Sequence, residues 1–96
     1  MSSTEDRRKN WTFLTNHAQV LLCLADRPDI RLRDVAERVG ITERATQRIL
    51  AELIDAGYVK AERIGRRNRY TVDREHAMRH SAQFGHEIGA LLEALS

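Results

Sequence analysis

One short segment of the sequence gathers side chains that can form paired hydrogen bonds with the edges of nucleic-acid bases. Arginine can donate two bonds to guanine, glutamine can bond adenine in the same paired way, and alanine can contact the thymine methyl group. A threonine beside the free backbone amides of a helix start suits a phosphate. These types occur together on the outward part of one expected helix, at Thr42, Arg44, Ala45, Gln47 and Arg48.

A second basic cluster follows about fifteen residues later, where the sequence predicts a β-hairpin. We expect a strand over residues 58–64, a turn over 65–68 and a returning strand over 69–72. No acidic residue lies between Arg63 and Tyr70, so the hairpin tip could reach the backbone or the minor groove of DNA. The alternative is a charged edge that prevents strand aggregation. The residues of this expected wing are Arg63, Arg66, Arg67, Asn68 and Arg69.

Two short helices that meet at a tight corner must position the first cluster. Val35, Ala36 and Val39 share one helical face, and the small Ala36 allows close helix crossing. Gly40 can adopt the left-handed conformation of the corner. Thr42 is expected to cap the second helix. Its inward positions are Thr46, Ile49, Leu50, Leu53 and Ala56.

The remaining pattern adds a helix on each side of this unit and a short extended segment over residues 30–32. Thr15 or Asn16 could cap the first helix, whose apolar residues Val20, Leu21, Cys23 and Leu24 precede a stop at Pro28. We expect the hairpin to pack on the helices. The expected contacts are made by Val59, Ala61, Tyr70 and Val72. The predicted fold class is mainly α with a small β-hairpin, a winged helix-turn-helix with a C-terminal dimerisation helix.

The C-terminal segment carries an apolar stripe that a chain of 96 residues has difficulty covering alone. We expect these residues to form a homodimer interface, while the alternative is that the helix folds back on Val20, Leu21 and Leu24. The predicted organisation is a flexible tail over 1–10, a DNA-binding domain over 11–75, and a connector with the dimerisation helix over 76–96. The expected interface residues are Phe84, Ile88, Leu91, Leu92 and Leu95.

Composition and motifs narrow the classes of function. The net charge of +2 is only mildly basic, so the placement of charge matters more than its sum. The single cysteine, Cys23, excludes an intrachain disulfide and favours a cytoplasmic location. We expect no signal peptide, membrane span or membrane partner. There is no glycine-rich phosphate loop or nucleophile elbow, so we expect no enzyme, no catalytic residue and no cofactor.

Three histidines, His76, His80 and His86, lie close together in the sequence. Two of them are four residues apart, a spacing that on one helix can bind zinc or nickel. No cysteine pair accompanies them, and connector histidines are more often surface residues. We therefore expect no metal site. Titration with zinc that changed the DNA affinity of the protein would reverse this expectation.

Three segments together resemble the bacterial winged helix-turn-helix regulators of the MarR and ArsR type: residues 34–42, 53–59 and 65–70. The resemblance covers about residues 15–75. It implies a transcription regulator, usually a homodimer, whose second motif helix enters the major groove while the wing contacts the flank. By this resemblance the base readers are Arg44, Gln47 and Arg48, and the wing contacts are Arg66, Arg67 and Arg69.

The sequence thus predicts a homodimeric regulator, with repression as the expected mode, that binds a short and roughly palindromic stretch of double-stranded DNA. The small-molecule effector, if any, is left open. Two alternatives remain at this point. The same fold can serve as a protein-interaction module, and a winged helix can bind RNA. An ordinary solvated helix face, with Glu43 and Glu52 beside Arg44 and Arg48, would also explain the first cluster.

Overall fold

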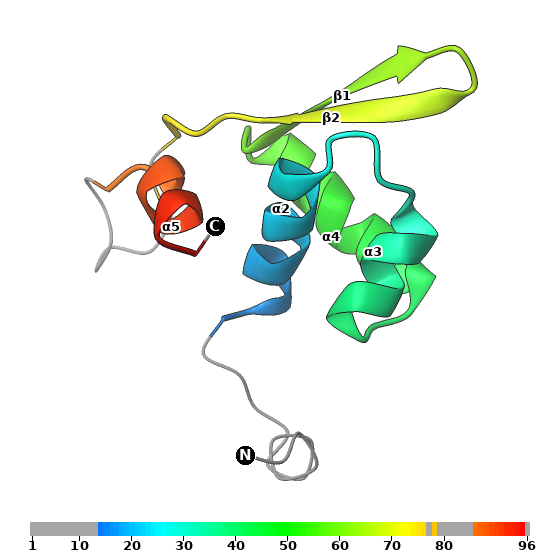
Figure 1. The fold of residues 1–96 in the computed structure, drawn as a ribbon, viewed down its shortest axis with the longest axis horizontal. Coiled ribbons are helices and arrows are strands. Elements are labelled where there is room, and N and C mark those ends of the chain that lie inside the picture. Colours follow the sequence, from blue (N-terminus) through cyan, green and yellow to red (C-terminus); the bar gives the residue numbers. More distant parts are fainter. Residues whose placement is uncertain (1–13, 77, 79–85, 96) are drawn as a thin grey trace, which may run out of the picture.

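The structure, a computed structural model, describes residues 14–76, 78 and 86–95. In this part of the chain three helices pack together beneath a two-stranded antiparallel hairpin, and a fourth helix follows the hairpin. Figure 1 shows that the last helix lies at one end of the molecule. The predicted fold class, a winged helix-turn-helix that is mainly α with one hairpin, is confirmed. The elements are α2 (Asn16–Asp26), α3 (Leu32–Val39), α4 (Glu43–Asp55), β1 (Val59–Ile64), β2 (Arg67–Val72) and α5 (Ile88–Leu95).

Helix α2 provides the centre of the core. Its N-cap is Thr15, whose hydroxyl oxygen accepts a hydrogen bond from the backbone N–H of Ala18 at 3.2 Å. This satisfies one of the amides that a helix start leaves without an intrahelical partner. The apolar face of the helix is buried against α3, α4 and β2. Its buried residues are Val20, Leu21, Cys23 and Leu24.

The corner between α3 and α4 is built as the sequence predicts. Gly40 has a φ of +86°, a left-handed conformation that side chains disfavour. The N–H groups of Gly40 and Ile41 both donate to the carbonyl oxygen of Ala36, at 2.8 and 3.0 Å. Thr42 then caps α4, because its hydroxyl oxygen accepts from the N–H of Ala45 at 3.0 Å. These local bonds fix where α4 begins.

Thr46 occupies a core position on α4 that is fully buried. A buried hydroxyl is costly unless it finds a partner. Here the Thr46 hydroxyl donates to the carbonyl oxygen of Thr42 at 3.0 Å, one turn earlier in the same helix. The methyl group is left to pack in the core, where the whole residue is buried. A threonine can therefore replace an aliphatic residue at this position.

The hairpin turn is tighter than predicted. Ile64 pairs with Arg67 in the strand register, so the turn consists of two residues, Gly65 and Arg66, instead of the four residues 65–68. Gly65 has a φ of +63°, which a two-residue turn requires at its first position. Arg67 and Asn68 consequently belong to β2 rather than to the turn.

The packing of the hairpin on the helices also differs at one position. Val59 and Tyr70 are buried and Val72 is half-buried, as predicted, but Ala61 is exposed. Ala61 pairs with Tyr70 across the hairpin. The long tyrosine side chain extends into the core, whereas a single methyl group does not reach it. The prediction that Ala61 contacts the helices was therefore wrong.

The segment before α3 is not a strand. Leu32 already belongs to α3, whose N-cap is Arg31, so only the buried Ile30 remains of the predicted extended segment 30–32. One backbone hydrogen bond, from the N–H of Tyr70 to the carbonyl oxygen of Pro28 at 2.8 Å, connects this region to β2. A single backbone bond at this place does not form a strand ladder.

Helix α5 packs on its own chain. Ile88 and Leu92 are buried, with exposed fractions of 8% and 2%, and belong to the same core cluster as Val20, Leu21 and Leu24. This is the fold-back arrangement that the sequence left open. Leu91 is half-buried and Leu95 is 49% exposed. Phe84 lies outside the described residues, so the structure does not address its predicted role at a dimer interface.

Gly89 marks a close approach within the chain. Its backbone N–H donates to the carbonyl oxygen of Arg74 at 2.7 Å, and an added Cβ would lie 2.7 Å from that same oxygen. The N–H of Ile88 also donates to the carbonyl oxygen of His76 at 2.7 Å. These bonds hold the start of α5 against the segment that follows the hairpin. Among the described residues, no helix is long and apolar enough to cross a membrane.

The one cysteine offers a simple check of this core. Cys23 is only 8% exposed, and burial raises the pKa of its thiol. Since the thiolate is the reactive form, we expect iodoacetamide to modify the folded protein at neutral pH much more slowly than the protein in guanidinium chloride. Alkylation followed by mass spectrometry measures both rates. Equal rates would contradict the burial of Cys23.

Candidate nucleic-acid interface

The outward face of α4 presents the predicted base-contacting side chains. Packing of the opposite face, from Thr46 to Leu53, leaves Arg44, Gln47 and Arg48 exposed. Ala45 is half-buried, and Thr42 is exposed at the N-cap. The Thr42 hydroxyl oxygen accepts from the Ala45 N–H, and its own hydrogen remains able to donate to a phosphate. The helix therefore carries polar donors along one accessible face.

A chain of polar contacts connects this face to the side of α2. A guanidinium nitrogen of Arg48 lies 3.7 Å from Oε2 of Glu52, and Nε2 of His17 lies 2.6 Å from Oε1 of the same carboxylate. The hydrogen bond from His17 lowers the pKa of Glu52, with Arg48 contributing in the same direction. The sequence indicated that Glu52 lies beside the arginines. It gave no signal for His17, which is 35 positions away.

The wing residues have different structural roles. Arg66 is exposed in the two-residue turn at the tip. Arg63 donates from Nε to the carbonyl oxygen of Gly65 at 3.2 Å, and Arg67 donates from a guanidinium nitrogen to the carbonyl oxygen of Asp29 at 2.6 Å. Asn68 donates from its amide to the hydroxyl oxygen of Tyr70 at 3.5 Å. The hydrogen bond of Arg67 thus links the wing to the segment before α3.

The strand pairing also places an acid within the basic cluster. Glu62 lies directly opposite Arg69 in the register, and opposite charges at such positions attract each other. The sequence shows no acidic residue between Arg63 and Tyr70, but pairing brings Glu62 from just outside that interval. The positive charge of the wing is therefore concentrated near its tip, around Arg63 and Arg66.

A polar groove of about 370 Å³ lies between the wing and the start of α3. One residue of this groove, Arg31 at the N-cap of α3, is a cation that the sequence did not predict as part of the site. The basic residues at positions 31 and 33, immediately before a predicted helix, were the available signal. The charged and polar residues that line the groove include Asp29, Arg31, Arg66, Arg67 and Asn68.

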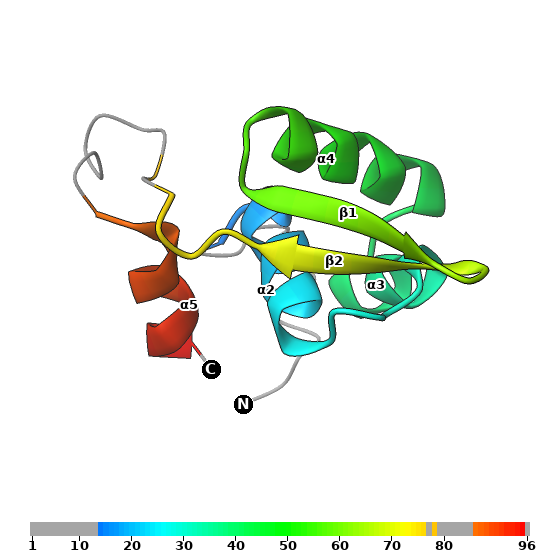
Figure 2. The same ribbon diagram turned by 90° about the horizontal axis from the view of Figure 1, so that it is seen from above.

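The two basic features share one end of the molecule. In both ribbon views the beginning of α4 and the tip of the hairpin lie at the end opposite α5 (Figures 1 and 2). A helix that enters the major groove, with a ribbon that reaches along the flanking backbone, requires this type of arrangement. The geometry is therefore compatible with duplex DNA.

Two of the three clustered histidines, His76 and His86, belong to the part of the chain that the structure describes. His76 packs edge-on against the ring of Tyr58, with ring centroids 4.3 Å apart, and the carbonyl oxygen of His86 accepts from the N–H of Met78 at 3.0 Å. His80 lies outside the described residues. Among the residues that are described, no group of three or more histidine, cysteine, aspartate or glutamate side chains could hold a metal ion.

Residues 15–60 match the family model of the winged helix-turn-helix DNA-binding domain. No curated protein is significantly similar to the sequence. Several solved structures share the fold. One of them is a predicted DNA-binding transcriptional regulator from E. coli, with 20% identity and a TM-score of 0.58 over 81% of this chain and 70% of that chain.

Two further structures contain small molecules. The PcaV transcriptional regulator from Streptomyces coelicolor, in complex with its natural ligand, has 24% identity and a TM-score of 0.57. A MarR family protein of Mycobacterium tuberculosis, in complex with salicylic acid, has 23% identity and a TM-score of 0.56. Each match covers 85% of this chain, which spans 60% and 57% of those proteins.

The family match and the shared fold agree with the geometry of α4 and the wing. The family match indicates a winged helix-turn-helix DNA-binding domain over residues 15–60, and the solved structures have the same fold.

Proposed function

We propose that this protein is a sequence-specific regulator of transcription that binds double-stranded DNA in the cytoplasm. The observation that carries the proposal is that α4, which exposes Arg44, Gln47 and Arg48, begins at the same end of the molecule as the tip of the hairpin (Figures 1 and 2). These side chains can form paired bonds to guanine and adenine in the major groove. A protein-interaction module does not require that combination.

In the proposed complex the start of α4 enters the major groove. Arg44, Gln47 and Arg48 read base edges, Ala45 contacts a thymine methyl group, and Thr42 bonds a phosphate together with the amides of the helix start. The wing follows the flanking backbone. Arg63 and Arg66 make the main backbone contacts at the tip of the wing, and Arg69 makes a further one. Arg67 and Asn68 orient the ribbon through their bonds to Asp29 and Tyr70.

We propose that two copies bind together and repress transcription by occupying a roughly palindromic site. The remaining apolar surface of α5 supports a homodimer, because Leu91 is half-buried and Leu95 is 49% exposed. Ile88 and Leu92 are buried in the core of their own protomer, and they hold in place the helix that carries this surface. Sedimentation at micromolar concentration tests this part of the proposal. A dimer is expected, and a monomer would contradict it.

Substitution of Arg66 by alanine tests DNA binding with little risk to the fold, because this side chain lies in the exposed turn. We expect weaker binding to all duplex sequences and a salt dependence shallower by about one unit in the logarithmic slope, as the loss of one phosphate contact implies. Fluorescence anisotropy with labelled duplex DNA over a series of salt concentrations measures both quantities.

The matched control for this experiment is Arg74→Ala, which removes an exposed cation near α5, away from the wing tip. We expect it to change the salt slope less than Arg66→Ala. If Arg66→Ala leaves affinity and slope unchanged, the wing does not contact DNA and a protein-interaction module becomes the better account. Stronger competition by single-stranded RNA than by duplex DNA would favour the RNA-binding alternative.

A further inference from the structure

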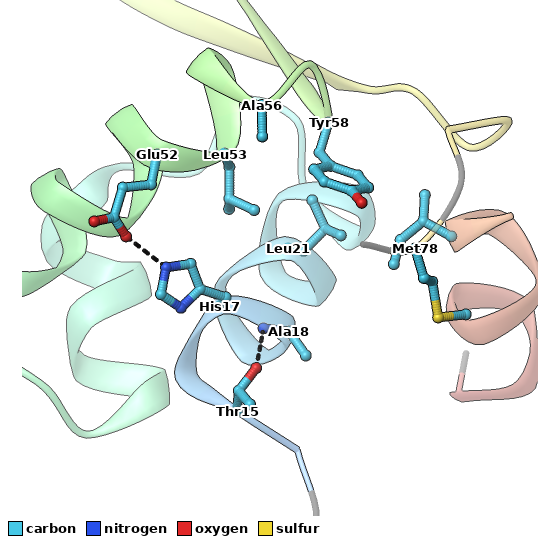
Figure 3. Close-up of a pocket in the computed structure, with 10 residues that line it drawn as sticks. Thr15, His17, Ala18, Leu21, Glu52, Leu53, Ala56, Tyr58 and Met78 are labelled. Carbon is cyan, nitrogen blue, oxygen red and sulfur yellow. Dashed lines mark hydrogen bonds and ion pairs between the residues drawn. The ribbon is translucent and has the colours of Figure 1, made fainter. Parts of the chain in front are cut away.

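The polar contacts between α2 and α4 place a histidine behind Arg48, one of the proposed base readers. His17 is the second residue of α2, and the packing of α2 against α4 brings its side chain to Glu52. Figure 3 shows the His17 ring directed toward the Glu52 carboxylate, with the bond between them as a dashed line. Leu21 and Leu53 line the cavity beside this bond, so the bond is partly sheltered from water.

The two oxygens of Glu52 have different partners. Oε1 lies 2.6 Å from Nε2 of His17, and Oε2 lies 3.7 Å from a guanidinium nitrogen of Arg48. The hydrogen bond from His17 is the main cause that lowers the pKa of Glu52, so this group is a carboxylate at neutral pH. The contact with His17 is the shorter of the two. The orientation in which the carboxylate meets Arg48 is therefore set by a residue of another helix.

The ion pair with Glu52 draws the Arg48 side chain away from the start of α4. Glu52 lies four residues after Arg48 in this helix, whereas the proposed complex places the bases near the helix start. An arginine that shares its charge with a carboxylate has fewer donors free for a guanine. The side chains of the pair are 63% and 50% exposed, so the pair is weak and DNA can separate it. A positive charge on His17 competes for the same carboxylate and makes the separation easier.

We infer that His17 is a positioning residue for Arg48, which orients Glu52 and, when protonated, neutralises that carboxylate so that Arg48 can bond a base. The inference rests on the proposed function and adds a residue that controls one of its base contacts. Histidine changes its charge between about pH 6 and 8, whereas carboxylate, guanidinium and phenol groups ordinarily keep theirs. Among the described residues that line the cavity beside His17, the other titratable side chains are Glu52 and Tyr58. Discrimination between base pairs by Arg48 therefore improves as the pH falls.

The pH dependence of this discrimination tests the inference. Fluorescence anisotropy compares the preferred duplex with one changed at the base pair whose discrimination is lost in Arg48→Ala. We expect the ratio of the two affinities to rise about threefold from about pH 8 to about pH 6, which is the scale of one exposed ion pair. The stronger attraction of a more positive protein to phosphates affects both duplexes and cancels in the ratio. A ratio that stays constant or falls over this range would overturn the inference.

Two variants at position 17 separate the hydrogen bond from the charge. His17→Gln keeps an N–H donor for Glu52 but cannot gain a proton, so we expect it to show the discrimination of the wild type at about pH 8 throughout the range. His17→Leu also removes the donor and leaves Glu52 to Arg48, so its discrimination should be lower and equally independent of pH. The matched control is His86→Gln, which removes an exposed histidine two residues before α5 and should keep the wild-type profile. A wild-type profile in His17→Leu would contradict the assignment of His17.

A second base pair shows whether His17 acts through Arg48 or through the general structure of α4. At the base pair whose discrimination depends on Arg44, neither the pH nor His17→Leu should change the ratio of affinities, because Arg44 lies about two helical turns from Glu52. An equal loss at both base pairs would contradict the positioning role. If the wild type bound all duplexes equally, the proposed function would fail. If it discriminated between duplexes independently of pH and of His17, only the present inference would fail.

Discussion

Arg44→Ala is expected to lower the affinity for the preferred duplex by about five- to 150-fold, the range for a lost bidentate contact with a base. Arg44 lies on the exposed first part of α4, so its removal should leave the free energy of unfolding nearly unchanged. Arg48→Ala should act in the same direction, with a smaller loss because Glu52 already offsets part of its charge. Anisotropy titrations with the preferred duplex and an unrelated duplex measure the effect.

The discrimination between the two duplexes is the decisive quantity in this experiment. Loss of a base contact should reduce the affinity for the preferred sequence much more than for the unrelated one. The wing variant Arg66→Ala provides the comparison, since it should weaken both duplexes equally. If Arg44→Ala also weakened both equally, this side chain would contact only phosphate, and the assignment of α4 as a base-reading helix would be wrong.

Leu92→Ala is expected to destabilise the protein by about 2–5 kcal/mol, as is usual for a leucine truncated in a core. Leu92 is 2% exposed and belongs to the same core cluster as Leu21 and Leu24 of α2. The cost should therefore be independent of protein concentration, because the contact lies within one chain. Urea unfolding, followed by circular dichroism at several concentrations, measures it.

Leu95→Ala is the matched control on the same helix. Leu95 is 49% exposed, so its truncation should change the free energy of unfolding of one protomer by no more than about 0.5 kcal/mol. In the proposed homodimer it should instead weaken the association of two copies. A large, concentration-independent loss for Leu95→Ala with none for Leu92→Ala would contradict the orientation of α5.

The features that the sequence predicts correctly have local causes. Gly40 is recognisable because a corner between two helices needs a left-handed residue, and Thr42 because a helix start needs an acceptor for its free amides. The apolar spacing that includes Ile49 and Leu53 then fixes the buried face of α4. Once that face is known, the exposure of Arg44, Gln47 and Arg48 follows.

The features that sequence reasoning missed depend on contacts between distant segments. The bonds of Arg67 to Asp29 and of Glu52 to His17 join residues 38 and 35 positions apart, and no periodicity predicts them. The length of the hairpin turn was also misjudged. Polar residues such as Arg67 and Asn68 are indicative of a turn, but in this ribbon they lie on exposed strand positions.

The surface on which α5 packs could not be predicted from the sequence, for a different reason. A stripe of leucines predicts that one helical face is buried but does not say by which surface. Both the fold-back and the dimer explanations require the same pattern. The structure assigns Ile88 and Leu92 to the core of their own protomer. Leu91 and Leu95 are the described stripe residues that retain surface for a second copy.

Selection of bound fragments from a pool of random duplex DNA tests the central claim most directly. Sequence-specific binding by a homodimer predicts enrichment of one roughly palindromic motif whose half-sites are about 10–10.5 base pairs apart, or a multiple of that distance. The motif should contain guanine or adenine at the positions that lose discrimination in the Arg44→Ala variant. A bound pool that remains random in sequence would contradict sequence-specific recognition by α4.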